Sequence, residues 1–170
     1  MIKNIFLDID ETLAHTMLGN PNQDHRSFIL QNDETYFTIF HPQAKDVIDY
    51  SRECVGYDNV YLLTTSISDY AQKINEIGEW GFEKDHIIPR EIINSHTTQE
   101  AYGESGICKH VLYDLNNVLV DNLPFSYNNN KCGMMGITEK NYLKVRDYYG
   151  TNLAYNPFFD NFKEFINERL

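Results

Sequence analysis

The segment NIFLDIDETLAHT, residues 4–16, joins a short apolar run to two aspartates and a threonine at alternate positions. An apolar run of this length is typical of a strand that is buried inside a sheet. Asp8, Asp10 and Thr12 follow it with a period of two, so an extended backbone would point them toward the same side. Two like charges that point the same way need a chemical reason. The segment therefore predicts a functional site directly after the first strand.

Three further apolar runs predict the other strands of the sheet. The clearest are DNVYLLTTS at residues 58–66 and NNVLVDN at residues 116–122, and HIIP at residues 86–89 is weaker. Strands that are apolar throughout, without alternation, are typical of parallel sheets that are covered on both faces.

Helical patterns lie between and after these runs. Residues 41–54, 66–81 and 156–170 each place apolar side chains at the spacing of one helix face, and Pro42 suits a first turn. Alternating strands and helices predict an α/β fold, with a doubly wound, mainly parallel sheet of the Rossmann-like kind.

Two segments interrupt the alternation. Residues 13–41 hold two strand-like runs around QNDE, which predicts a small β-hairpin inserted after the first strand. Residues 94–110 are predicted as a long polar loop, a kind of segment that is uncommon and often functional. Neither is long enough for a large cap domain, so we expect a single domain over residues 1–170.

The composition narrows the function classes. The net charge of −11 repels phosphate backbones and disfavours nucleic-acid binding by electrostatics. No apolar run approaches the ~20 residues of a membrane span, and the acidic start of the chain is unlike a secretion signal. Cys54, Cys108 and Cys132 lack the spacing of a zinc site or a disulfide framework, which predicts reduced thiols in a cytoplasmic protein.

The three clearest strands end in polar residues that suit phosphate chemistry. They are Asp8 and Asp10 after the first strand, Thr64, Thr65 and Ser66 after the second, and Asp121 and Asn122 after the third. In open α/β sheets, ligands bind beyond the carboxyl ends of the strands, where these groups would converge. Clustered carboxylates repel one another without a cation, and Mg²⁺ prefers one or two carboxylates together with a phosphate. We therefore expect Mg²⁺ beside a phosphate, with one aspartate attacking phosphorus and the next protonating the leaving group.

The motif DIDET, residues 8–12, matches the DxDxT signature of the haloacid dehalogenase-like phosphatases, and the chain resembles that superfamily. Within it, LDIDETLAH, VYLLTTSISDYA and VLVDNLPFSY are similar to the signature blocks of the small phosphatases that act on the RNA polymerase II C-terminal domain. The resemblance covers most of residues 4–128. It implies a Mg²⁺-dependent phosphomonoester hydrolase with an aspartyl-phosphate intermediate.

The resemblance also implies roles for the acidic residues. Asp8 would be the nucleophile, and Asp10 would be the general acid and then the base for the hydrolytic water. The carboxylate of Asp8, the main-chain carbonyl of Asp10 and the carboxylate of Asp121 would bind the metal, with Asn122 close by.

Other residues are expected to bind the substrate phosphate. Thr64 would hold a phosphoryl oxygen, Thr12 would orient the acidic loop beside it, and Thr65 follows the same strand as Thr64. The family has a lysine that neutralises the phosphate and the attacking carboxylate, and we assign Lys109 to that role because it precedes the last catalytic strand. Lys84 and Lys131 are the rival assignments.

The substrate stays open between a phosphoprotein and a small phosphorylated molecule, because a hairpin shields only part of a site. A nucleotidase or polynucleotide-end phosphatase is an alternative with the same chemistry, since Phe28, Tyr36, Phe37 and Tyr102 could stack on bases. Packing inside the hairpin is the simpler role for these aromatic side chains.

Two alternatives are not enzymes. A non-catalytic phosphoacceptor of the response-regulator kind would carry its aspartate after the third strand instead of the first, and it would lack DxDxT. A binding protein that has lost activity would not need the full set of catalytic residue types that this chain holds. Oxygen ligands suit Mn²⁺ as well as Mg²⁺, so that choice stays open, as does the oligomeric state.

Overall fold

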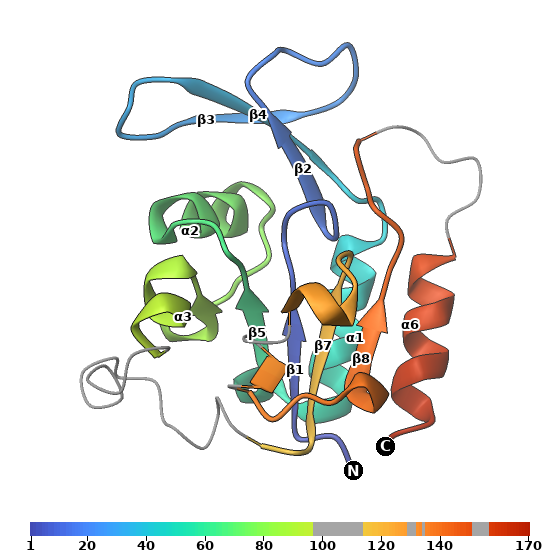
Figure 1. Ribbon diagram of the computed structural model, residues 1–170. Coiled ribbons are helices and arrows are strands. Elements are labelled where there is room, and N and C mark those ends of the chain that lie inside the picture. The colour runs from blue at the N-terminus through green and yellow to red at the C-terminus, as the bar shows by residue number, and fades with distance from the viewer. Residues whose placement is uncertain (97–113, 129–131, 134, 151–156) are drawn as a thin grey trace.

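A five-stranded parallel sheet forms the centre of the molecule (Figure 1). The structure is a computed structural model, and it describes every residue except 97–113, 129–131, 134 and 151–156. The strands are β1 (Asn4–Leu7), β5 (Val60–Leu63), β6 (Ile87–Ile88), β7 (Asn117–Asp121) and β8 (Tyr142–Lys144). Neighbours pair in parallel in the order β6-β5-β1-β7-β8. The predicted parallel sheet is confirmed, and β8 is a strand that the sequence patterns did not predict.

Helices cover both faces of this sheet. They are α1 (Ala44–Val55), α2 (Ser68–Ile77), α3 (Arg90–His96) and α6 (Phe158–Asn167), with short 3-10 turns η1 (Tyr57–Asn59), η2 (Lys84–His86), η4 (Phe125–Asn128) and η5 (Glu139–Asn141). The three predicted helices are confirmed as α1, α2 and α6. The predicted loop 94–110 is wrong at its start, because α3 runs to His96, and its remainder lies outside the described residues. None of the helices in the described residues has the length and apolar character needed to cross a membrane.

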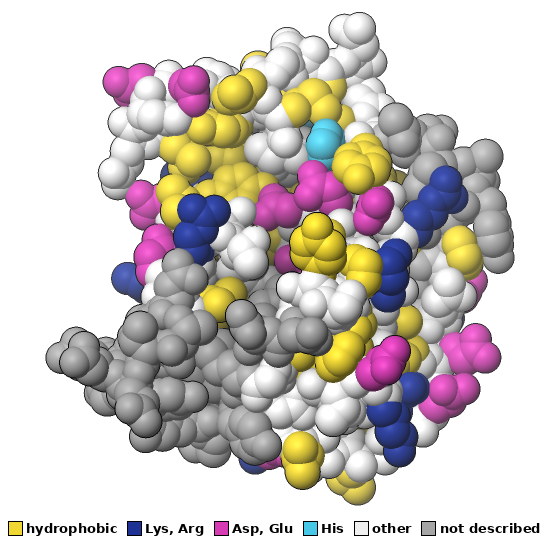
Figure 2. Space-filling view, viewed as in Figure 1, with side chains coloured by type: hydrophobic (Ala, Val, Ile, Leu, Met, Phe, Trp, Pro, Cys, Tyr) yellow, Lys and Arg dark blue, Asp and Glu magenta, His cyan; other side chains and the backbone are white. Residues whose placement is uncertain are grey.

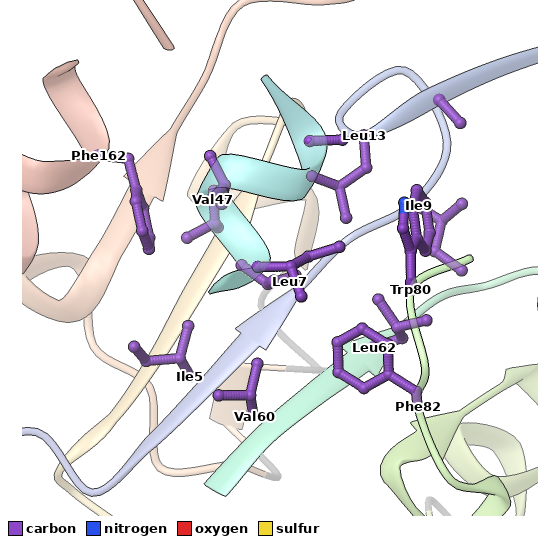
Figure 3. Packing of buried hydrophobic residues seen from close by; sticks show 14 of the residues in the cluster. Ile5, Leu7, Ile9, Leu13, Val47, Val60, Leu62, Trp80, Phe82 and Phe162 are labelled. Atoms are coloured by element: carbon purple, nitrogen blue, oxygen red, sulfur yellow. The ribbon is translucent and has the colours of Figure 1, made fainter. Parts of the chain in front are cut away.

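Alternate side chains of β1 pack into two separate apolar clusters. Ile5 and Leu7 belong to a cluster that includes Val47 of α1 and Phe162 of α6 (Figure 3). Phe6 belongs to a second cluster that includes Ile93 of α3. Because both faces are buried, the strand needs apolar residues throughout, which explains the continuous apolar run in the sequence.

The insertion after β1 is a small antiparallel sheet that lies beyond the carboxyl ends of the central strands (Figure 1). Its strands are β2 (Ala14–Met17), β3 (Arg26–Ile29) and β4 (Thr35–Phe40), in the order β2-β4-β3. The predicted hairpin is confirmed as β3 and β4, and β2 adds a third strand. The sheet contacts α2 through the rings of Phe28 and Tyr70, whose centroids are 5.9 Å apart.

Candidate active site

Three neighbouring strands deliver polar side chains to one end of the sheet. Asp8 directly follows β1, Asp121 ends β7 and Thr64 follows β5, and all three side chains are buried. The main-chain N–H of Asp8 donates to the carbonyl of Val120 at 3.0 Å, so the register places Asp8 beside Asp121. Adjacent strands lie about 4.8 Å apart, which brings the two carboxylates within reach of a common ion. The three strand ends therefore converge, as the sequence predicts.

The acidic loop, residues 8–14, is a tight turn held by its own backbone. The main-chain N–H groups of Thr12 and Ala14 donate to the carbonyl of Ile9 at 3.3 and 3.0 Å. Glu11 takes up the left-handed region with a φ of 56°. The turn reverses the chain within a few residues and brings Thr12 back against the carboxylate that precedes it.

Thr12 joins the acidic loop to the end of β7. Its hydroxyl donates to Asp8 Oδ2 at 2.9 Å and accepts the main-chain N–H of Asn122 at 3.1 Å. Its side chain is 1% exposed, so both bonds lie away from solvent. A buried hydroxyl that both donates and accepts fixes the orientation of the carboxylate that it contacts.

The carboxylate of Asp10 turns toward β5 and α2. Its Oδ2 accepts the hydroxyls of Ser66 at 2.8 Å and Thr64 at 3.4 Å, and its Oδ1 accepts the hydroxyl of Tyr70. The side chain of Thr65 is exposed, and Ser66 is the residue of this segment that reaches Asp10. Sequence reasoning missed Tyr70 as a member of the site, because its helical spacing assigned it to the core.

Asp121 is held on both of its oxygens. Oδ1 accepts the main-chain N–H of Leu123 at 2.8 Å, and Oδ2 accepts the amide of Asn128 at 2.9 Å. The same amide group of Asn128 donates to the hydroxyl of Tyr142 at 2.9 Å. These bonds fix the orientation of the Asp121 carboxylate. The sequence motifs did not predict Asn128 as a member of the site.

The donor set suits a hard cation, although the three predicted acidic side chains do not cluster together. Across the described residues, no three His, Cys, Asp or Glu side chains gather in an arrangement that could hold a metal ion. Asp8 and Asp121 are adjacent, whereas the Asp10 carboxylate points to Ser66 and Tyr70. Two carboxylates and a main-chain carbonyl of Asp10 would offer only oxygen donors, which is the chemistry that Mg²⁺ selects.

A segment after β8 returns to the acidic loop. The amide of Asn122 donates to Asp147 Oδ1 at 3.0 Å, and the main-chain N–H of Tyr148 donates to the carbonyl of Glu11 at 2.7 Å. The main-chain N–H of Val145 donates to the carbonyl of Asp121 at 2.9 Å. No sequence signal marked these residues, because they follow an unpredicted strand.

The mouth of the site is acidic. Figure 2 shows Asp and Glu side chains gathered near the middle of this face, below the inserted sheet. Burial raises the pKa of Glu11, and the hydrogen bond between Glu11 and His15 at 3.2 Å opposes that rise. An anionic substrate would need a positive countercharge here, from a metal ion or a lysine.

Of the three candidate lysines, Lys84 is the one that lies in the described part of the chain. Lys84 lies in η2 ahead of β6, and therefore at the amino end of the parallel sheet, opposite the site. This placement argues against Lys84 as the phosphate-neutralising residue. Lys109 and Lys131 lie outside the described residues.

The chain is similar to a known protein family. A family model described as NLI interacting factor-like phosphatase matches residues 3–167. No curated protein gives a significant sequence match.

Two solved structures share the fold. One is a fission yeast RNA polymerase II CTD phosphatase, a variant of Fcp1 bound to beryllium fluoride, with a TM-score of 0.58 and 15% identity over 98% of this chain and 50% of that chain. The other is described as Fcp1, an essential RNA polymerase II CTD phosphatase, with a TM-score of 0.58 and 16% identity over 99% of this chain and 49% of that chain. The chain thus spans about half the length of these structures.

Proposed function

Because the chain belongs to the NLI interacting factor-like phosphatase family, we propose that it is a Mg²⁺-dependent phosphomonoesterase that forms an aspartyl-phosphate on Asp8. The observation that carries the proposal is the position of Asp8, buried at the carboxyl end of β1, adjacent to Asp121 and oriented by Thr12. A carboxylate with a fixed orientation suits this reaction, since phosphoryl transfer depends mainly on positioning and charge.

The chemistry divides into two transfers. A carboxylate oxygen of Asp8 would attack phosphorus while the bond to the ester oxygen breaks, and Asp10 would give its proton to that oxygen. Asp10, now ionised, would then take a proton from a water molecule as the water attacks the phosphorus. This second step would release inorganic phosphate and restore both carboxyl groups.

The metal would be held by the carboxylates of Asp8 and Asp121 and by the main-chain carbonyl of Asp10. A bound Mg²⁺ supplies positive charge that offsets the repulsion between a carboxylate and a dianionic phosphate. The hydrogen bonds that Asn128 and Leu123 donate to Asp121 support this proposal, because donors to a carboxylate ligand orient it toward the metal. Thr12, Thr64, Thr65 and Lys109 remain our proposed phosphate-binding residues.

We propose a phosphorylated protein segment or a small phosphorylated molecule as the substrate. The inserted sheet is small, which supports a mouth that stays open to a phosphate carried on a larger molecule. The nucleotide alternative loses its support within the hairpin, because Phe28 is buried and its ring stacks on Tyr36 at a centroid distance of 5.5 Å. Cys54 is a free thiol, which supports our proposal of a cytoplasmic location.

The test compares three esters with and without Mg²⁺. Purified protein is assayed on an aryl phosphate, a phosphoserine peptide and a nucleoside monophosphate, in excess Mg²⁺ and in excess EDTA. We expect many turnovers on the aryl and peptide esters in Mg²⁺ and none in EDTA. Release of a single equivalent of the alcohol or phenol, with the phosphoryl group retained on the protein, would instead indicate a phosphoacceptor. No turnover on any ester would contradict the proposal.

A matched pair of variants isolates the nucleophile. Asp8→Asn should abolish turnover and keep the thermal unfolding midpoint close to that of the wild type, because amide and carboxylate have nearly the same shape. Asp85→Asn makes the same chemical change on a side chain that is 79% exposed in η2, and it should keep full activity. Equal activity in the two variants would remove Asp8 from the mechanism.

A further inference from the structure

A chain of hydroxyl groups leads from Asp10 into the inserted sheet. The hydroxyl of Tyr70 on α2 contacts Asp10 Oδ1 and also lies 2.8 Å from Thr16 Oγ1 on β2. Thr16 Oγ1 in turn lies 2.8 Å from Thr38 Oγ1, and the two threonines are paired across β2 and β4. We propose that Tyr70 is a positioning residue for the general acid Asp10, and that Thr16 and Thr38 anchor it to the inserted sheet. This inference rests on the function proposed above.

The hydrogen bonds have one consistent direction. A hydroxyl carries a single proton, and an ionised carboxylate can only accept. Tyr70 therefore donates to Asp10 and accepts from Thr16, which accepts from Thr38. Asp10 Oδ1 thus faces a hydroxyl donor.

The anchor is rigid at both ends. Tyr70 and Thr38 are 8% and 0% exposed, and the ring of Tyr70 packs against Phe28 of β3. Asp10 Oδ2 is the oxygen that faces Ser66 and Thr64, so donors from different elements fix the plane of the carboxyl group. Both oxygens of the Asp10 carboxyl group therefore have hydroxyl partners, and its orientation is fixed from two sides.

Loss of this anchor should lower kcat most for substrates whose leaving oxygen must be protonated. When the Asp8–phosphorus bond forms and the ester bond breaks, the proton of Asp10 goes to the leaving oxygen. An alkyl oxygen, as in phosphoserine, leaves poorly without that proton, whereas 4-nitrophenolate leaves without it. General acid catalysis is worth ~10²–10⁴-fold in rate, and a misplacement of about 1 Å can cost ~10²-fold.

The experiment measures kcat and KM of Tyr70→Phe on a phosphoserine peptide and on 4-nitrophenyl phosphate. We expect kcat to fall about 10- to 100-fold on the peptide and less than about 3-fold on the aryl ester, with little change in KM. Tyr61→Phe is the matched control, because Tyr61 is also buried and its hydroxyl donates to the carbonyl of Asp58, 2.8 Å away. The kcat of Tyr61→Phe should fall little, and to the same extent on both esters.

Thr16→Val tests the connection to the inserted sheet and leaves Tyr70 in place, so it also serves if Tyr70→Phe does not fold. It should show a smaller loss with the same preference for the peptide. The double variant should be no worse than Tyr70→Phe, because both changes cut one chain of bonds.

Three outcomes separate the possibilities. Equal losses on the two esters would overturn the role of Tyr70 and leave the phosphatase itself standing. Losses that add in the double variant would overturn the link through Thr16. A wild-type protein that hydrolyses neither ester would overturn this inference together with the proposed function.

Discussion

The hydroxyl of Thr12 lies 2.9 Å from Asp8 Oδ2, four residues back along the chain. The same hydroxyl accepts the main-chain N–H of Asn122, so one small side chain joins the carboxyl ends of β1 and β7, which are neighbours in the sheet. The direction of the Asp8 carboxylate is therefore set by a contact between two strands, and its disruption should be visible in both stability and turnover.

Thr12→Val should lower the free energy of unfolding by about 1–3 kcal/mol, because it leaves a buried carboxylate oxygen and a buried N–H without this partner. It should also lower kcat, since Asp8 loses its fixed orientation. Urea unfolding and steady-state kinetics measure the two effects. Thr12→Ser keeps the hydroxyl and should retain most of both properties, and a valine variant as active as the serine variant would contradict this role.

Asn128→Ala should weaken Mg²⁺ binding about 10- to 100-fold, because a hydrogen-bond donor that orients a metal ligand typically contributes this much to metal affinity. Asn128 donates to Asp121 Oδ2 and has no proposed contact with the substrate phosphate. Calorimetric titration with Mg²⁺ measures the affinity without reference to turnover. Asn161→Ala, an exposed position on α6, is the control, and unchanged Mg²⁺ affinity in Asn128→Ala would exclude Asn128 from the metal site.

His41 should make the fold sensitive to mild acid. Burial lowers the pKa of His41 from 6.5 to about 4. The unfolded chain therefore takes up a proton at a higher pH than the folded chain does, and the free energy of unfolding should fall by about 3 kcal/mol as pH drops from about 6.5 to about 4. Above this range the contribution is fully present.

His41→Asn isolates that effect. The asparagine oxygen can still accept the main-chain N–H of Gln43, which lies 3.0 Å from His41 Nδ1, but it does not titrate. Urea unfolding at several pH values should show a flatter dependence between pH 6.5 and 4 in the variant. An equally steep dependence in both proteins would assign the acid sensitivity to other groups.

The sequence patterns predicted the elements whose signal is local. The apolar runs that became β1, β5 and β7 are buried on both faces, so their residues alone carry the information. The acidic motif could be placed because it follows directly after one of them. By contrast, β8 spans only three residues, and its burial comes from packing in the sheet instead of from its own pattern.

The prediction of the site from the sequence was incomplete for a related reason. Tyr70 lies 60 positions from Asp10 and has the spacing of a core residue on α2, so its hydroxyl contact depends on how α2 meets the acidic loop. Asp147 is 25 positions from Asn122 and follows the unpredicted β8. Such contacts arise from the tertiary arrangement, and no motif in the chain encodes them.

The central claim is that Asp8 becomes phosphorylated during turnover, and chemical trapping tests it most directly. The protein is mixed with 4-nitrophenyl phosphate and Mg²⁺, quenched in acid within the first turnovers, reduced with borohydride and analysed by peptide mass spectrometry. An acyl phosphate on Asp8 is reduced to homoserine at position 8, and we predict this conversion there and at no other aspartate. Phosphate release by an active protein whose Asp8 is recovered unchanged at every quench time, or homoserine at a different position, would contradict the mechanism.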